Sequence, residues 1–121
     1  MEIFVGNDII EVSRIANLIE NVKFLHRVFS DAEIQYCEAN KAQNYAARFA
    51  AKEAVFKALS SKLDSNYSIN WKDISIEKSD NGRPIIVLFN HSEISDNYRF
   101  DVSLSNVKEY AMANVVMYSK N

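Results

Sequence analysis

The sequence predicts an α+β fold, because helical patterns dominate its first half and strand patterns its second half. The helical half centres on residues 45–59, which contain no Gly or Pro and in which seven of fifteen residues are Ala or Leu. The second half holds alternating stretches at residues 73–78 and 99–106, with the tight-turn pair Asn81-Gly82 between them. Helices followed by an antiparallel meander are typical of the α+β class.

A strand is expected at residues 2–10, before the helices, with Ile3, Val5 and Ile9 among its apolar points. Gly6 in this strand either marks a bulge or bend, or lets a second backbone or a ligand approach closely. From residue 11 to about residue 29 the apolar residues recur at helical spacing, which predicts two short helices.

The sequence Ser30-Asp31-Ala32-Glu33 is a capping box, so a further helix is expected from residue 31 to about residue 39. Residues 40–44 are polar and are expected to form a joint. The central helix is predicted over residues 45–59, and its pattern fades in the polar residues that follow.

The central helix carries its charges in two stripes, Arg48 with Lys52 and Glu53 with Lys57, and the members of each pair are one turn apart. The rest of this helix is apolar nearly all round, so we expect it to be buried, with its charges paired, coordinated or at an opening. An ordinary ion pair between Glu53 and Lys57 on a solvated edge is the alternative interpretation.

After this helix the patterns are those of strands joined by polar turns. Ile74 and Ile76 share one side of the first of these strands. The expected order is strand 73–78, hairpin turn 79–83, strand 84–89, polar connection 90–97, strand 99–106, turn 108–109 and strand 110–118.

The bulk properties limit the function. A length of 121 residues fits one domain, residues 1–121, with a single core. The net charge of -2 gives no overall attraction for nucleic acid or an anionic membrane, and no apolar run is long enough to span a bilayer. One cysteine, Cys37, cannot form an internal disulfide, which is typical of a reducing cytoplasm. We therefore expect a cytoplasmic protein with no nucleic acid or membrane as partner.

Three blocks of the sequence carry its chemistry. They are Gly6-Asn7-Asp8-Ile9 with Arg14 after it, Arg48-Phe-Ala-Ala-Lys-Glu-Ala-Val-Phe-Lys57, and Ser103-Leu-Ser-Asn106-Val-Lys-Glu-Tyr-Ala111. The order and spacing of these blocks resemble those of the short 4′-phosphopantetheinyl transferases, which modify acyl carrier proteins. The resemblance covers the chain from end to end. The resemblance implies the fold of that family, a small antiparallel sheet wrapped around one long central helix.

The resemblance also implies a reaction. In this family the serine hydroxyl of an apo acyl carrier protein attacks the β-phosphate of coenzyme A and expels 3′,5′-adenosine bisphosphate, a step of fatty-acid biosynthesis. The positions that match the family's Mg²⁺ carboxylates are Asp8 and Glu53, and Mg²⁺ is usually held by one or two carboxylates beside phosphates. From the residues alone, a turn or helix-capping role is the favoured interpretation of Asp8, and the resemblance favours the metal.

Two more residues of the central helix are expected in the site. Lys57, one turn beyond Glu53, matches a family lysine near the phosphates and can neutralise charge on the transferring phosphoryl group. The serine needs a base, and either Glu53 or a metal-held water beside it can serve. Arg48 is expected to contact a phosphate of coenzyme A or an interface, and a structural ion pair is its alternative.

The nucleotide end of coenzyme A is expected near Gly82-Arg83-Pro84, which matches a Gly-Lys-Pro hairpin of the family; an ordinary Asn-Gly turn explains the same residues. Two positions depart from the family pattern. Asn106 replaces a histidine, which keeps hydrogen bonding but loses the positive charge and proton transfer. Ser60-Ser61-Lys62 replaces a Gly-x-Gly loop, whose glycines let a phosphate approach backbone amides.

Acyl carrier proteins are acidic, so a local basic patch would attract them in spite of the net negative charge. Arg14, Lys23 and Arg27 lie in the segment that contacts the carrier in the family. The alternative is a solvated helix face, because Glu11 and Glu20 dilute the positive charge.

The resemblance to the short family members implies a homotrimer with coenzyme A in clefts between neighbouring subunits. Two rival functions remain open at this point. One is a non-catalytic module that binds a carrier protein or coenzyme A, suggested by Asn106 and the missing glycines. The other is a transferase for the carrier domain of a polyketide or peptide synthetase.

Overall fold

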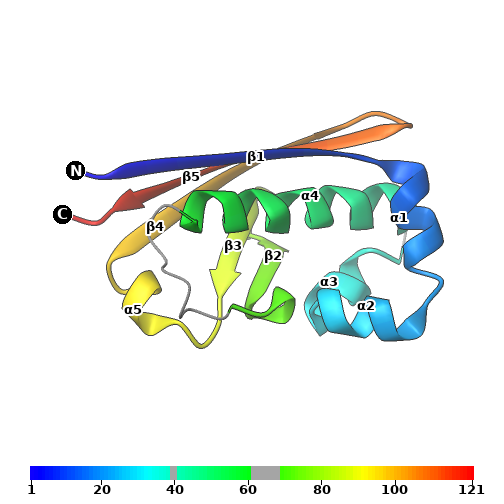
Figure 1. Ribbon diagram of the computed structural model, residues 1–121, viewed down its shortest axis with the longest axis horizontal. Helices are drawn as coiled ribbons and strands as arrows, with labels where there is room; N and C mark the ends of the chain where they lie inside the picture. The colour runs from blue at the N-terminus through cyan, green and yellow to red at the C-terminus, as the bar shows by residue number, and fades with distance from the viewer. Residues whose placement is uncertain (39–40, 61–68) are drawn as a thin grey trace.

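The computed structural model describes residues 1–38, 41–60 and 69–121 and confirms the α+β class (Figure 1). A long helix lies along a sheet, the short helices of the N-terminal part gather near one end of this helix, and a further short helix, drawn in yellow, lies toward its other end. In chain order the elements are β1 (Ile3–Glu11), α1 (Val12–Leu18), α2 (Val22–Val28), α3 (Asp31–Tyr36), α4 (Lys41–Leu59), the 3-10 turn η1 (Trp71–Asp73), β2 (Ile74–Lys78), β3 (Pro84–Leu88), α5 (Ser92–Ser95), β4 (Tyr98–Asn106) and β5 (Tyr110–Ser119).

The strands form two antiparallel sheets where the sequence predicted one meander. The larger sheet has the order β1-β5-β4, and β2 and β3 form a separate hairpin. The prediction is wrong after β3, because Asn90 takes a left-handed backbone conformation, with φ of 68°, and the chain enters α5. When the chain returns as β4, it pairs with β5 and leaves β3 unpaired on that side.

The core lies between α4 and the larger sheet. Most of α4 is buried, and the small side chains Ala50, Ala51, Ala54 and Ala58 are fully covered. The inner face of β5 is also made of buried side chains. Because alanine adds little bulk, the helix and the sheet can approach closely along this line. The buried apolar residues of the described chain form one cluster.

At Gly6 the backbone of β1 lies close to the backbone of α4. A Cβ atom at this position would lie 2.0 Å from the carbonyl oxygen of Ala54 and 2.9 Å from the amide nitrogen of Ala58. Pairing between β1 and β5 continues through Gly6 without an extra residue. Of the two interpretations of Gly6, the close approach of a second backbone is therefore correct and the bulge is wrong.

We predict that Gly6→Ala lowers the free energy of unfolding by about 3 kcal/mol. The new methyl group would clash with backbone atoms of α4, which cannot move away by a change of rotamer as a side chain can. Chemical denaturation measures this loss. Gly82→Ala is the matched control, since a Cβ there meets nothing within 4 Å and only its φ of 85° opposes a side chain. Its cost should be about 1 kcal/mol. Equal losses for the two variants would contradict the steric explanation.

Two helix boundaries differ from their predictions. The central helix begins at Lys41, so the polar residues that were expected to form a joint are mostly helical. Polarity alone does not stop a helix, and this stretch contains no Gly or Pro to do so. The helix with the capping box ends at Tyr36, where Cys37 turns into the core and is fully buried. Burial raises the pKa of the Cys37 thiol to about 12.

A buried ion pair ties α3 to α4 and β2. The predicted capping box is present, with Ser30 and Glu33 as its members. Glu33 is fully buried, and its carboxylate accepts hydrogen bonds from the backbone amides of Ser30 and Ile76, each at 2.8 Å. The Nζ atom of Lys52, also fully buried, lies 2.7 Å from Glu33 Oε1 and donates to the carbonyls of Trp71 and Ile74. Lys52 is therefore a structural residue of the core.

The outer face of the larger sheet is apolar along β1 and β5. Side chains alternate between the two faces of a strand, and the outward residues of β1 include Ile3, Val5 and Ile9, which are 60, 70 and 62% exposed. Beside them on β5 lie Met112 and Val116, the pairing partners of Ile9 and Val5. No helix in the described part of the chain is long and apolar enough to cross a membrane.

Candidate functional site

The fold brings Asp8 of β1 next to two charged residues of α4. The Nζ atom of Lys57 lies 3.3 Å from Asp8 Oδ1 and donates a hydrogen bond of 2.9 Å to the carbonyl of Asn7. Asp8 is also close enough to Glu53 to repel its negative charge. Residues that are some fifty positions apart in the sequence thus form one cluster, which we call the carboxylate cluster: Asp8, Glu53 and Lys57.

Two alternatives for these residues are wrong. Lys57 pairs with Asp8 across to β1, and it forms no ion pair with Glu53 along its own helix. Asp8 lies inside β1, and the N-cap position of α1 is occupied by Glu11, so Asp8 does not cap this helix.

The carboxylate of Glu53 is held in an unfavourable position for a negative charge. Burial raises the pKa of Glu53, and repulsion from Asp8 raises it further, while Lys57 and Arg14 lower it. Two carboxylates on adjacent elements that repel each other attract a cation. Lys57 supplies part of that positive charge, and it is about half exposed to solvent.

The described residues contain no group of three or more His, Cys, Asp or Glu side chains that could hold a metal ion. The pair of oxygen donors Asp8 and Glu53 fits Mg²⁺, which usually keeps several waters and takes one or two carboxylates together with phosphates of a substrate.

The three basic residues that were expected to contact a carrier lie on two helices. Arg14 is exposed on α1 and close enough to Glu53 to stabilise its charge. Lys23 and Arg27 are exposed on α2, where they are one turn apart. The structure thus places Arg14 at the carboxylate cluster and the other two on the neighbouring helix.

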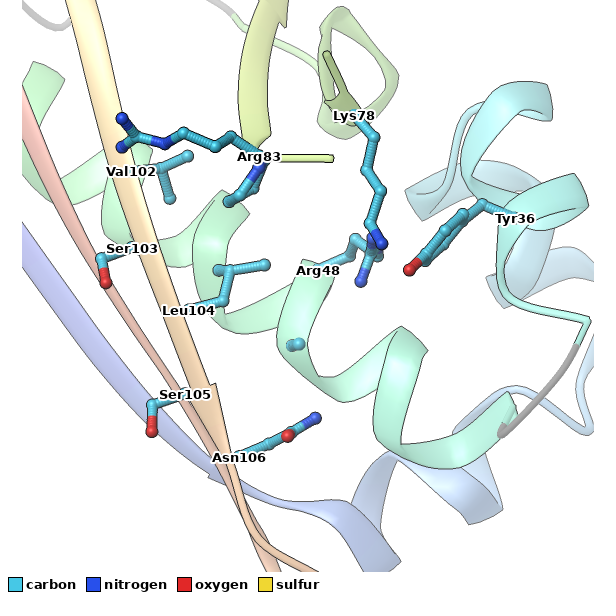
Figure 2. Close-up of a pocket in the computed structure, with 11 residues that line it drawn as sticks. Tyr36, Arg48, Lys78, Arg83, Val102, Ser103, Leu104, Ser105 and Asn106 are labelled. Carbon is cyan, nitrogen blue, oxygen red and sulfur yellow. The ribbon is translucent and has the colours of Figure 1, made fainter. Parts of the chain in front are cut away.

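A second group of predicted residues lines a cleft of about 310 Å³ (Figure 2). Arg48 of α4, Arg83 and Pro84 of the β2–β3 hairpin, and Asn106 at the end of β4 all contribute to its walls. We call this cavity the basic cleft, because its lining contains Arg48, Lys78 and Arg83 and no acidic residue. Arg83 has one acidic neighbour outside the lining, Asp101, at 3.6 Å on the exposed surface.

Arg48 is the most unusual residue of the basic cleft. It is only 4% exposed, and its Nε atom is buried without a hydrogen-bond partner. Among the described residues Arg48 forms no ion pair, so the alternative of a structural ion pair is wrong. Its guanidinium carbon instead lies 4.1 Å from the centre of the Tyr36 ring. A buried guanidinium without an acidic partner is costly unless an anion binds it.

Gly82, a predicted nucleotide contact, and Ser60, where the chain departs from the family's glycine loop, are not among the residues that line the basic cleft. Gly82 occupies the hairpin turn with φ of 85°, and its amide donates to the carbonyl of Ser79, but it does not line the basic cleft. The interpretation of Gly82 as a turn residue is therefore sufficient. Ser60 directly follows α4, and its hydroxyl donates to the carbonyl of Lys57. Ser61 and Lys62, the rest of the departure from the family's glycine loop, lie outside the described residues.

The carboxylate cluster and the basic cleft lie on different sides of α4. Arg48 and Glu53 are five residues apart, which separates them by about 140° around the helix axis. Arg48 and Lys57, nine residues apart, point in about opposite directions. No residue of the carboxylate cluster lines the basic cleft.

Sequence reasoning missed two residues of the basic cleft, Lys78 and Tyr36. Lys78 pairs with Pro84 in the hairpin. Lys78 could have been predicted from the hairpin turn, because the residues that flank a turn pair with each other and Pro84 was already a predicted site residue. Tyr36 carried no such signal, because its place depends on how α3 packs beside α4.

Comparisons with known proteins agree on one family. The family model of the 4′-phosphopantetheinyl transferase superfamily matches residues 4–115. The holo-[acyl-carrier-protein] synthase of Ruminiclostridium cellulolyticum is 44% identical over 97% of this chain and 92% of its own length. That of Clostridium acetobutylicum is 42% identical over 93% of this chain and 94% of its own length. The structure of the Helicobacter pylori synthase in complex with coenzyme A is similar, with a TM-score of 0.80 and 32% identity, over 94% of this chain and 99% of that one.

Proposed function

The chain belongs to the 4′-phosphopantetheinyl transferase superfamily, and from this premise we propose that it transfers the 4′-phosphopantetheine group of coenzyme A to a serine of apo acyl carrier protein. The product nucleotide is 3′,5′-adenosine bisphosphate. The observation that carries the proposal is the carboxylate cluster, which the fold assembles from the two motifs that define the resemblance. We propose that residues 1–121 form one domain that carries this activity. The protein would act in the cytoplasm, in fatty-acid biosynthesis.

In the reaction, the serine oxygen of the carrier forms a bond to the β-phosphorus of coenzyme A, and the bond from this phosphorus to the bridging oxygen breaks. The bridging oxygen leaves with the bisphosphate. Glu53, or a water that it holds, takes the serine proton. Lys57 is proposed to stabilise charge on the transferring phosphoryl group with its ammonium group. Its present contacts with Asp8 and Asn7 hold it at the cluster.

Asp8 and Glu53 are the residues that would hold Mg²⁺. When bound, Mg²⁺ reduces the charge repulsion between the pyrophosphate and an incoming hydroxyl. The repulsion between the two carboxylates supports this assignment, because a divalent cation would relieve it.

The basic cleft is proposed to bind the adenosine end of coenzyme A. Arg48, Arg83, Pro84 and Asn106 line it, and Gly82 shapes the adjoining turn. Asn106 can donate a hydrogen bond to a phosphate but cannot carry a proton between pH 5 and 8. In this cleft a hydrogen bond is all that is required of Asn106, because the proposed base lies in the carboxylate cluster.

Two observations support a homotrimer with coenzyme A bound between subunits. The carboxylate cluster and the basic cleft lie on different sides of α4, so one coenzyme A molecule can use both groups if neighbouring copies each supply one. The apolar outer face of β1 and β5 is a large exposed patch, and such patches mark protein interfaces. A second copy of this chain is the occupant that we propose for it.

We predict that Val5→Glu converts the trimer into monomers at micromolar concentration, because it would bury a charge in the interface. Val107→Glu is the matched control, since Val107 is 65% exposed, close to the 70% of Val5, but lies in the turn between β4 and β5. Sedimentation velocity gives the oligomeric state. Val5→Glu should also abolish transfer. A trimer that survives Val5→Glu would contradict the proposed interface.

Arg14, Lys23 and Arg27 are proposed to attract the acidic carrier protein. Arg14 has the strongest support, because it lies near Glu53 and a carrier bound there would present its serine to the carboxylate cluster. Charge attraction of this kind mainly raises the association rate and weakens with salt.

Intact-protein mass spectrometry tests the proposed function directly. The protein is incubated with Mg²⁺, coenzyme A and an apo carrier from fatty-acid biosynthesis, a polyketide synthase or a peptide synthetase, each in a separate reaction. A mass gain of one phosphopantetheine on the fatty-acid carrier, faster than on the others, is the expected result. Faster modification of the polyketide synthase or peptide synthetase carrier would show that the protein serves that pathway and not fatty-acid biosynthesis. Binding of coenzyme A without a mass gain on any carrier would leave a non-catalytic module.

A further inference from the structure

Tyr36 brings two positive charges together in the basic cleft. The guanidinium carbon of Arg48 lies 4.1 Å from the centre of the Tyr36 ring, and the Nζ atom of Lys78 lies 4.7 Å from it. The two side chains come from α4 and β2 and converge on the ring from α3 (Figure 2). Both distances are within the range of cation–π attraction.

The two cations have no acidic partner among the described residues. Neither Arg48 nor Lys78 forms an ion pair there, and the lining of the basic cleft contains no Asp or Glu. Positive charges that share a site repel each other, so the attraction of each to the electron-rich face of one aromatic ring helps to hold them together. Hydrogen bonding from Lys78 lowers the pKa of the Tyr36 phenol, and Arg48 adds to this effect.

The paired cations match one part of the proposed substrate. Coenzyme A carries its negative charge at two places, the pyrophosphate and the phosphate monoester on the ribose. The carboxylate cluster is proposed to act at the pyrophosphate, which leaves the monoester for the basic cleft. A phosphate monoester carries between one and two negative charges at neutral pH and accepts several hydrogen bonds. The buried and unpartnered Nε atom of Arg48 is a donor that such a group can use.

We propose that Tyr36 is a positioning residue, whose ring holds Arg48 and Lys78 together so that they bind the phosphate monoester of the nucleotide. This inference rests on the proposed function. Tyr36 itself does not contact the reacting atoms. By holding the two cations together, the Tyr36 ring makes the protein prefer nucleotides that carry the 3′-phosphate over those that lack it.

The preference is measured by calorimetric titration of the protein with 3′,5′-adenosine bisphosphate and with 5′-AMP. Tyr36→Leu removes the ring and is expected to lower the ratio of the two affinities about tenfold. Tyr36→Phe keeps the ring and should stay within about twofold of the wild type. Tyr36 is 40% exposed, so neither change should prevent folding, which circular dichroism checks.

Lys78→Met should lower the same ratio as Tyr36→Leu does. Lys72→Met is its matched control, because Lys72 is an exposed lysine beyond the other end of β2 that does not line the basic cleft. In steady-state transfer, Tyr36→Leu should raise the KM for coenzyme A about tenfold, leave kcat within about threefold, and leave the KM for dephospho-coenzyme A unchanged.

An unchanged affinity ratio in Tyr36→Leu would overturn the inference, and so would an equal loss in Tyr36→Phe, because the hydroxyl and not the ring would then be responsible. The titrations do not depend on catalysis. If the wild type prefers the bisphosphate and Tyr36→Leu removes that preference, the role of Tyr36 is supported even where no carrier is modified and the transferase function fails. If carriers are modified but the wild type shows no such preference, the inference fails alone.

Discussion

Replacing Glu53 by Gln is expected to lower the rate of phosphopantetheine transfer by about a hundredfold to ten-thousandfold, the range typical of a lost acid–base group. Gln has nearly the same shape but can neither accept the serine proton nor contribute a charge to a metal ion. The variant should still bind 3′,5′-adenosine bisphosphate, since Glu53 does not line the basic cleft. Transfer is measured on the carrier by mass spectrometry.

The same substitution is expected to raise the thermal stability of the protein without divalent cations. Burial and Asp8 raise the pKa of Glu53, so the folded state holds this proton more tightly than the unfolded state does. The cost of ionising Glu53 appears as the pH rises from the ordinary glutamate pKa through the raised value, and it is fully present above that value. Glu53→Gln removes this cost, so its advantage should be largest above the raised pKa and shrink as the pH is lowered through that window.

Glu77→Gln is the matched control, because Glu77 is a partly buried glutamate on β2 outside both groups of site residues. It should change neither transfer nor the melting temperature appreciably. A Glu53→Gln variant with more than a tenth of wild-type transfer would exclude Glu53 as base and metal ligand. Addition of Mg²⁺ should stabilise the wild type more than Glu53→Gln, because only the wild type offers two carboxylates.

Replacing Lys52 by Met is expected to lower the free energy of unfolding by about 3–5 kcal/mol, a large part of the total stability of a small domain. The reason is the carboxylate of Glu33, which is fully buried and would lose its charged partner at 2.7 Å. Two backbone amides would still donate to it, but no positive charge would remain. Denaturation in urea at neutral pH measures the loss.

Lys57→Met is the control for this prediction, since it removes a lysine from the same helix whose ion pair with Asp8 is partly exposed. Its cost should be below about 1 kcal/mol. Combining Lys52→Met with Glu33→Gln removes both charges and should recover part of the stability. A cost for Lys52→Met as small as that of Lys57→Met would show that the buried pair contributes nothing.

The sequence predicts most of the elements of the fold, because local patterns decide them. The alternation around Val102 and the isoleucines at 74 and 76 correctly predicts buried positions on two strands. The errors occur where polarity was taken as the end of a helix and where order along the chain was taken as order in the sheet. The first turn of α4 is polar and still helical, and β3 does not pair with β4 although the two are neighbours in the sequence.

The candidate site follows the same rule. The resemblance selects Asp8 and Glu53, which are 45 positions apart in the sequence, and the structure brings them together, which no local pattern could predict. Charge spacing on the helix suggested one ion pair, Glu53 with Lys57, and could not supply partners for Arg48 and Lys52, which are both positive. The actual neighbours are Asp8 for Lys57, Glu33 for Lys52 and Tyr36 for Arg48, and all three lie on other elements.

The contact at Gly6 has a consequence for how far the proposed metal site can be altered. At this point the backbones of β1 and α4 face each other with no side chain between them, so exchanging a side chain there can only push the two elements apart. Asp8 is two residues beyond Gly6 on β1, so the same backbone contact limits the distance between Asp8 and Glu53 on α4. Selection among cations of different ionic radius must therefore act through the length of the two acidic side chains, where adding or removing one methylene is a coarse step.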